Sequence, residues 1–129
     1  AGASLEAVRA VAAVDDVVAR FVPQVELLPR VGAFVTHGGN NSTNEALRAG
    51  TPVVVVPFGA EQRSNALRVE GLGVGSSLDP TALDVADVTR AVAAALSTER
   101  QARSKALAAK LPEGDGAVRV VDALEQSGP

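Results

Sequence analysis

The sequence predicts an α/β fold in which helices flank a parallel sheet. Two continuous apolar runs, at residues 33–36 (AFVT) and 52–57 (PVVVVP), lack the alternation of half-exposed strands. Such runs are typical of strands buried on both faces. A helix-forming segment follows each run after a short connection. This repetition is typical of right-handed βαβ units, whose strands lie parallel.

The elements before the first buried run are short. Residues 17–21 (VVARF) form a β-branched run just before Pro23, so we expect a strand that leads into a turn. Residues 25–30 (VELLPR) allow only a helical turn, because Pro29 interrupts them.

A helix is expected at residues 42–49 (STNEALRA), between the two buried runs. Ser42 and Glu45 have the spacing of a capping box, in which each side chain accepts a backbone N–H of the first turn. Gly50 follows the last helical position, where glycine commonly ends a helix.

The run at residues 52–57 is the clearest strand of the chain. We expect a helix at 60–70, stopped by Gly71, and a further short strand at 73–76. The C-terminal part, residues 79–129, is expected to be helical. Its alanine-rich amphipathic segments predict helices at 84–96, 99–111 and 115–124.

Composition excludes several classes of function. The chain has 129 residues, 47% apolar and 21% charged, which suits one globular domain or a piece of a larger one. A net charge of −3 with 2% aromatic residues lacks the groups that bind nucleic acid. Cysteine is absent and histidine occurs once, which excludes disulfides, cysteine nucleophiles and thiolate or multi-histidine metal sites.

The opening of the chain is apolar, but Glu6 and Arg9 interrupt it and it is too short to span a bilayer. We therefore expect a cytoplasmic setting and no membrane partner. The chain does not begin with methionine, and its opening has no clear structural start. We expect residues 1–129 to form a single, truncated domain of a longer polypeptide.

Polar clusters follow both buried runs. Residues 37–43 (HGGNNST) follow the first run, and residues 57–62 (PFGAEQ) follow the second. In open α/β sheets, ligands bind beyond the carboxyl ends of the strands, where loops lead into helix N-termini. We therefore expect the two clusters to converge on one pocket.

The first cluster suits a phosphate group. Gly38 and Gly39 permit a tight loop, and the following helix presents unpaired N–H groups with partial positive charge. A P-loop lysine is absent, so a Walker-type NTPase is not supported. Glu45, about one turn further on, can accept hydrogen bonds from a diol such as ribose. The candidate side-chain donors to a diphosphate, without a metal ion, are His37, Asn41, Ser42 and Thr43.

A purely structural explanation stays open for the individual residues. Ser42 and Glu45 are accounted for by a capping box. A lone histidine such as His37 is usually a capping or core residue. Glu61 and Gln62 suit the start of any helix, because its N-terminus favours acidic and polar groups.

The string from residue 21 to residue 75, which begins FVPQ and contains THGGNNSTNEA and PFGAEQ, joins these elements at fixed spacings. It closely resembles the signature of UDP-glycosyltransferases and of the related bacterial macrolide-type glycosyltransferases, enzymes of the GT-B fold. In that family the signature lies in the C-terminal half, a Rossmann-like parallel sheet with flanking helices that binds the nucleotide sugar. The resemblance implies that the chain is part of such a donor-binding domain.

The resemblance also implies a role for each matching position. Phe21 and Val22 match positions near the base, and Gln24 matches a glutamine near the nucleoside. Glu45 matches the acid that holds the ribose hydroxyls. The positions that match the diphosphate-binding loop are His37, Gly38, Gly39, Asn41, Ser42 and Thr43, and those that match the acid–amide pair on the transferred sugar are Glu61 and Gln62.

By resemblance, the reaction inverts the anomeric centre. An acceptor hydroxyl, deprotonated by a histidine of the N-terminal domain, attacks C1 while the diphosphate leaves. No catalytic base is therefore expected in this chain, and His37 would stabilise the diphosphate. No metal or other cofactor is expected.

The chain departs from plant members of the family. Phe21 and Asn40 stand where plant members have tryptophan, and Glu61 replaces the common aspartate. A bacterial enzyme of natural product glycosylation, using a UDP- or dTDP-sugar, fits better. Three alternatives remain: a donor-binding subunit that needs a separate acceptor-domain chain, a non-catalytic nucleotide-binding module, and a sugar-nucleotide epimerase. The Glu61-Gln62 pair favours transfer over epimerisation. The sequence identifies neither the acceptor nor the transferred sugar.

Overall fold

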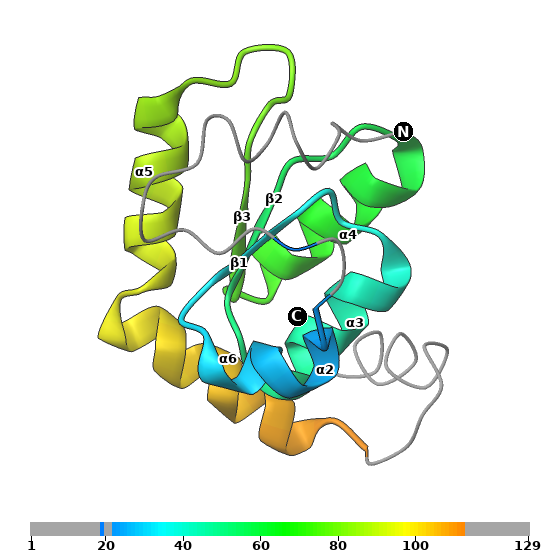
Figure 1. Cartoon of the computed structure of the whole chain (residues 1–129), viewed down its shortest axis with the longest axis vertical. Helices are drawn as coiled ribbons and strands as arrows, with labels where there is room; N and C mark the ends of the chain where they lie inside the picture. Colours follow the sequence, from blue (N-terminus) through cyan, green and yellow to red (C-terminus); the bar gives the residue numbers. More distant parts are fainter. Residues whose placement is uncertain (1–18, 20–21, 113–129) are drawn as a thin grey trace.

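The computed structural model describes residue 19 and residues 22–112 of the 129-residue chain. Its centre is a three-stranded parallel sheet in the order β1-β2-β3 (Figure 1). The strands are β1 (Phe34–Thr36), β2 (Val53–Val55) and β3 (Gly75–Ser77). In this register Phe34 lies beside Val53, and Val53 lies beside Gly75. The predicted parallel α/β fold is confirmed.

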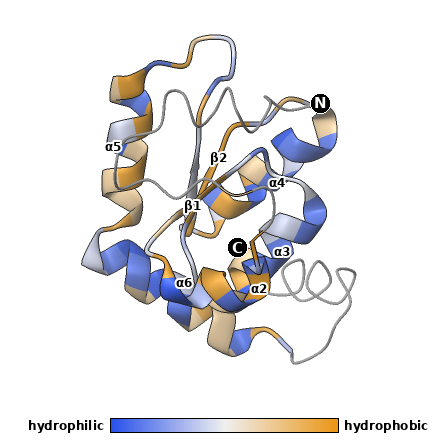
Figure 2. Ribbon diagram, in the orientation of Figure 1, coloured by the Kyte–Doolittle hydropathy of each residue, from blue (hydrophilic) through white to orange (hydrophobic). Residues whose placement is uncertain are grey.

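Helices cover both faces of this sheet. In Figure 2, orange segments concentrate on β2 and on the sheet-facing sides of the helices, whereas blue segments lie outward. This amphipathic pattern is the one that drives helices onto a sheet. On one face lie α3 (Asn40–Ala49) and α4 (Ala60–Gly71), on the other lies α5 (Val85–Ala95), and α6 (Thr98–Lys110) packs against α3 and α5.

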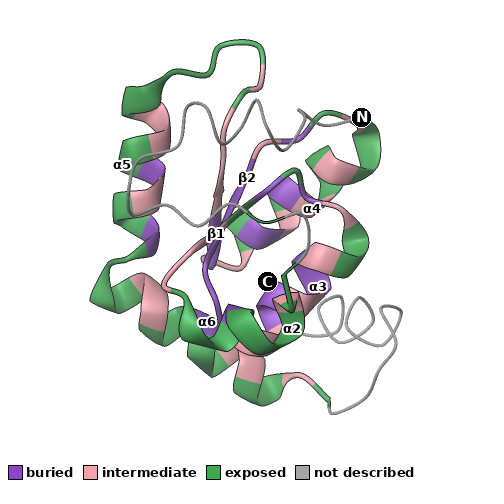
Figure 3. Ribbon diagram, viewed as in Figure 1, coloured by how far each residue is buried: buried purple, intermediate pink, exposed green. Residues whose placement is uncertain are grey.

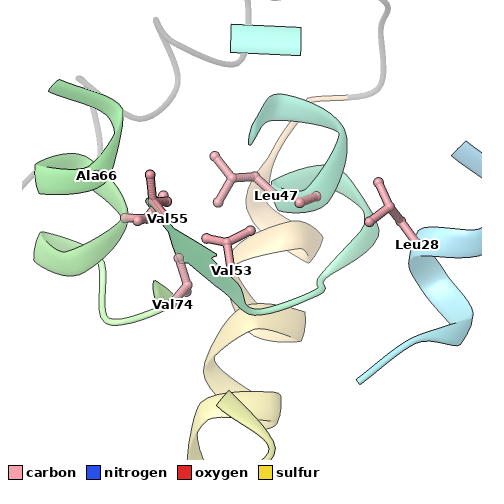
Figure 4. Packing of buried hydrophobic residues seen from close by; sticks show 8 residues of the cluster. Leu28, Leu47, Val53, Val55, Ala66 and Val74 are labelled. Carbon is pink, nitrogen blue, oxygen red and sulfur yellow. The ribbon is translucent and has the colours of Figure 1, made fainter. Parts of the chain in front are cut away.

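The valines of β2 contribute to two cores. Val53 and Val55 lie in the larger cluster with Leu47 of α3, whereas Val54 lies in the smaller cluster with Ala91 of α5. All three valines are 0% exposed, because successive side chains of a strand point to opposite faces and both faces are covered. Figure 3 shows β2 as buried among largely exposed outer helix faces. Figure 4 shows the larger cluster, formed by Leu28, Leu47, Val53, Val55, Ala66 and Val74 among others.

The prediction that residues 33–36 are buried on both faces is wrong. Phe34 is half-buried, and Val35 is 47% exposed. Val35 is in register with Val54, so its side chain points to the face that α5 covers. However, α5 packs on β2 and β3, and β1 lies at the edge of the described sheet. α5 therefore does not cover Val35, which stays exposed.

The helical segment before β1 is longer than the one turn predicted. It consists of α2 (Gln24–Leu27) and the 3-10 helix η1 (Leu28–Arg30), which follows directly and accommodates Pro29 in its first turn. Leu28 anchors the turn in the larger core, where it is 2% exposed. The Thr51 hydroxyl donates a hydrogen bond of 2.5 Å to the Leu28 carbonyl oxygen, which ties this turn to the start of β2.

Glycines end both crossover helices. Gly50 follows α3 with φ 72°, which confirms the predicted stop, and a Cβ there would lie 3.2 Å from Lys105 Cα. Gly71 is the last residue of α4, and the left-handed glycine is instead Gly73, with φ 74°. The following strand therefore occupies Gly75–Ser77, slightly later than predicted.

The two helices after β3 begin at side-chain caps. Asp84 accepts a hydrogen bond from the Asp87 N–H at 2.8 Å and starts α5. Ser97 accepts one from the Arg100 N–H at 3.2 Å and starts α6. The helices predicted at 84–96 and 99–111 are confirmed.

The predicted helix at 115–124 lies outside the described residues. The predicted strand at 17–21 also lies outside them, except for Ala19, which is exposed. None of the helices within residues 22–112 combines the length and the apolar character needed to cross a bilayer.

Candidate functional site

The two polar loops meet at the carboxyl edge of the sheet, as expected from the sequence. Asn65 of α4 donates hydrogen bonds from Nδ2 to the Gly38 carbonyl oxygen at 2.7 Å and to Asn40 Oδ1 at 2.8 Å. A Cβ at Gly38 would lie 3.3 Å from the carbonyl oxygen of Gln62, so the backbones of the two segments are also close. The loop after β1 therefore rests on the first turns of α4.

Gly38 is required by the conformation of this loop. Its φ is 92°, in the region that side chains rarely adopt, and an added Cβ would lie 2.7 Å from Val55 Cγ1. The Gly38 N–H donates to Thr36 Oγ1 at 3.2 Å, which closes the turn onto the end of β1. Only glycine permits this approach of the loop to the core.

The N-terminus of α3 is open. Gly39 is its N-cap residue and has no side chain to accept a hydrogen bond. The N–H groups of Asn40, Asn41 and Ser42 form the first turn, and they lack partners within the helix. They give this end of α3 a partial positive charge.

The predicted capping box is not formed, because α3 begins two residues earlier than expected. Ser42 is the third residue of the helix and cannot cap it. Glu45 instead accepts a hydrogen bond at Oε2 from Gln24 Nε2, at 2.6 Å, and the same Nε2 lies 3.3 Å from Ser42 Oγ. These three side chains form a polar cluster between α2 and α3.

His37 is exposed and lies beside the open end of α3. A Cβ added at Gly39 would lie 3.0 Å from His37 Nε2, so the imidazole covers the N-cap residue. The alternative of a core histidine is therefore wrong. The ring can donate a hydrogen bond to the same group that the helix N-terminus attracts.

A cavity of about 410 Å³ lies next to this helix end, between α3 and the α2–η1 turn. Glu45 contributes a carboxylate to its wall, and Asn41 lies at its edge near the first turn. The cavity thus continues from the open N-terminus of α3 along one side of the helix. Its described lining residues are Val25, Pro29, Asn41, Asn44, Glu45, Arg48 and Ala49.

The first turns of α4 lie against the loop after β1, outside the lining of this cavity. Gln62 Oε1 accepts hydrogen bonds from the N–H groups of Phe58, at 2.7 Å, and Gly59, at 3.2 Å. This side chain therefore shapes the loop after β2, while the neighbouring Glu61 is exposed.

Three positions that the sequence predicted for the site are not part of it in the described structure. Thr43 is 3% exposed, and its N–H donates to the Gly39 carbonyl oxygen at 3.0 Å as part of the helix. Because α3 starts at Asn40, residue 43 falls on the core side. Val22 is 43% exposed, just before α2. Phe21 lies outside the described residues.

Comparison with known proteins identifies the family. The family model described as UDP-glucoronosyl and UDP-glucosyl transferase matches residues 9–106. The chain belongs to this transferase family. The parallel sheet, its helices and the signature are thus those of a glycosyltransferase of the GT-B fold.

Individual members of this transferase family resemble the chain over most of its length. The NDP-glycosyltransferase YjiC of Bacillus subtilis (strain 168) is 38% identical over 117 residues, which is 86% of the chain and 30% of that protein. The 4'-demethylrebeccamycin synthase of Lentzea aerocolonigenes is 38% identical over 109 residues, 84% of the chain and 26% of that protein. The chain therefore spans about a third or less of these relatives.

A solved transferase also has the same fold. The crystal structure of the glycotransferase of kitacinnamycin aligns with a TM-score of 0.68 and 33% identity, over 84% of the chain and 29% of the solved protein.

Some residues of this candidate site were not predicted from the sequence. Asn44 and Arg48 line the cavity with Asn41 and Glu45, because these four positions fall on one face of α3. Their spacing of three and four residues was the available signal. Asn65 was not predicted either, because its contact with the loop before α3 depends on how α3 and α4 pack.

Proposed function

We propose that this chain binds a nucleoside-diphosphate sugar, such as a UDP- or dTDP-sugar, as the donor half of an inverting glycosyltransferase. The observation that carries the proposal is the open N-terminus of α3, with His37 beside it and a cavity containing Glu45 next to it. This arrangement supports an anion at the helix end and a polar organic group in the cavity. A nucleoside diphosphate has both parts.

The diphosphate would lie against the first turn of α3. The N–H groups of Asn40, Asn41 and Ser42 can donate to phosphate oxygens, and the helix dipole adds attraction. His37 can donate from the side. The loop lacks a carboxylate ligand for a divalent ion, so we propose binding without a metal ion or other cofactor.

The nucleoside would occupy the 410 Å³ cavity. Glu45 Oε2 is engaged by Gln24, and its second oxygen can accept a hydrogen bond from a ribose hydroxyl. Val25 and Pro29 supply an apolar wall for a base. Gln24 would then orient Glu45 as well as approach the nucleoside.

The transferred sugar would extend from the diphosphate toward the start of α4. Glu61 is exposed there and can accept hydrogen bonds from sugar hydroxyls. Gln62 holds the loop after β2 through its Oε1, which leaves its amide nitrogen as the group for a sugar contact.

In the proposed reaction, an acceptor hydroxyl attacks C1 of the sugar from the side opposite the diphosphate. A base in an N-terminal acceptor domain, in the same or a separate chain, takes the hydroxyl proton while the bond between C1 and the diphosphate oxygen breaks. The charge that develops on the diphosphate is stabilised by the end of α3 and by His37. The chain alone is therefore expected to bind donor without transferring sugar.

The names of relatives support a small-molecule acceptor. One of them is a 4'-demethylrebeccamycin synthase, and another is the oleandomycin glycosyltransferase of Streptomyces antibioticus. A bacterial enzyme of natural product glycosylation is the proposal that fits these relatives. The cytoplasmic setting stays a prediction.

Isothermal calorimetry with UDP, dTDP and GDP tests the proposal. We expect heat of binding for UDP or dTDP, and a loss of about tenfold in affinity for His37→Ala, the size expected for one hydrogen bond to a charged group. Lys110→Ala, at the last residue of α6, is the control for loss of a surface donor and should bind like wild type. Negligible heats for all three nucleotides with wild type would overturn the proposal.

A further inference from the structure

Asn65 of α4 donates hydrogen bonds across to the loop before α3 and to the first residue of that helix. Its amide nitrogen has two hydrogens, and both are used: one on the Gly38 carbonyl oxygen and one on Asn40 Oδ1. The two acceptors flank Gly39, the N-cap residue of α3. The amide thus holds the loop on both sides of the helix start.

This position gives Asn65 control over the direction of the α3 N–H groups. Gly39 has no side chain, so no capping interaction of its own fixes the first turn. Asn65 supplies that constraint from outside the helix, with bonds of normal length at 2.7 and 2.8 Å. A phosphate-binding helix end works only if its donors are held to within about 0.5 Å of the positions that productive hydrogen bonding to the ligand requires.

Asn65 also connects the two halves of the donor site. It lies one turn after Gln62, whose Oε1 fixes the loop after β2. Movement of α4 would therefore shift both the sugar-facing start of α4 and the diphosphate-facing start of α3. The Glu45 cavity lies on the α2 side of α3 and has no lining residue from α4.

We propose that Asn65 is a positioning residue that orients the N-terminus of α3 for the donor diphosphate, without contacting the nucleoside. This inference rests on the proposed function. It predicts a separation of effects: loss of the amide weakens binding of the diphosphate part and leaves binding of the nucleoside part unchanged. A residue needed only for stability would not separate the two.

The test compares UDP with uridine on the whole 129-residue chain, by NMR titration of ¹⁵N-labelled protein, which also measures weak binding. Asn65→Leu keeps the approximate size and removes both hydrogen bonds. We expect the dissociation constant of UDP to rise about tenfold, and that of uridine to change less than about twofold. Asn40→Ala removes one of the two acceptors and should give a smaller loss in the same direction. If Asn65→Leu fails to fold, the affinities of Asn40→Ala for UDP and uridine test the inference instead.

Gln101→Leu is the matched control. Gln101 of α6 also donates from one amide nitrogen to two acceptors, the carbonyl oxygens of Gly32 at 2.6 Å and Ala95 at 2.8 Å. Gln101→Leu should lower the melting temperature as Asn65→Leu does. Its ratio of UDP affinity to uridine affinity should equal that of wild type.

The outcomes are distinct. If wild type binds UDP, and Asn65→Leu weakens UDP and uridine equally or weakens neither, the inference is wrong while the proposed function stands. If wild type binds neither compound nor dTDP, the proposed function fails and the inference fails with it. Selective loss of UDP binding in the Asn65 and Asn40 variants, absent in Gln101→Leu, supports it.

Discussion

Substitution of Gly38 by alanine probes the loop that the site depends on. The residue has φ 92°, and an alanine held there would cost about 1–3 kcal/mol of backbone strain. Its Cβ would also lie 2.7 Å from Val55 Cγ1 and 3.3 Å from the Gln62 carbonyl oxygen. Overpacking of this kind costs about 1–3 kcal/mol. We therefore expect Gly38→Ala to lower the free energy of unfolding by roughly 2–5 kcal/mol.

Urea denaturation followed by circular dichroism measures this loss. At an m-value of about 1–3 kcal/mol per M, the midpoint should fall by at least roughly 0.7 M. Gly71→Ala is the matched control, because a Cβ at Gly71 has no atom within 4 Å and its φ is not positive. That variant should lie within about 1 kcal/mol of wild type, on the stabilised side, since alanine favours helix.

Equal midpoints for Gly38→Ala and wild type would refute this account of the loop. They would mean that the chain adopts another backbone conformation after β1, and the position of His37 and the α3 N-terminus would no longer follow. If both Gly38→Ala and Gly71→Ala lowered the free energy of unfolding, the effect would come from replacing any glycine and not from the conformation at residue 38.

Three further predictions concern the ribose contact, the core and a surface carboxylate. Glu45→Gln should weaken UDP binding about tenfold in calorimetry because it removes a charged acceptor from the cavity, and unchanged affinity would contradict its role. Val54→Ala should lower the free energy of unfolding by about 2 kcal/mol, because two methyl groups leave a fully buried site, and a loss below about 0.5 kcal/mol in urea denaturation would contradict the two-core packing. The backbone N–H and the hydroxyl of Thr81 hold the pKa of Asp79 below its usual value. Thr81→Val keeps the N–H, so the pKa measured by NMR should rise part of the way toward its usual value. The stability that the lowered pKa contributes above the unfolded-state pKa, and that acidification through the folded-state pKa removes, should be correspondingly smaller. An unchanged pKa would contradict the hydroxyl contact.

The sequence was sufficient for the elements that have strong local signals. The continuous valine run predicted a fully buried central strand, and the three valines of β2 are 0% exposed. Asp84 and Gly50 have side-chain and backbone preferences that mark helix ends, and both lie at those ends. The resemblance of residues 21–75 to glycosyltransferases gave the family, which the family model confirms.

Features that depend on packing could not be predicted this way. Ser42 and Glu45 have the spacing of a capping box, but Gly38 allows the chain to turn earlier and α3 starts at Asn40. Val35 belongs to an apolar run, yet its exposure depends on where α5 packs. The contact of Asn65 with the loop joins residues 25 and 27 positions apart in the sequence, and no local pattern reports such a pair.

The proposed function requires that the end of α3 receives a diphosphate. A titration of ¹⁵N-labelled chain with UDP and with uridine tests it most directly, because each backbone N–H reports separately. We expect the amide signals of Asn40, Asn41 and Ser42 to shift with UDP and much less with uridine, while both compounds shift signals around Glu45. Shifts confined to the second cavity of about 570 Å³, between α4 and the loop after β3, would contradict it, as would UDP binding that leaves these three amides unchanged.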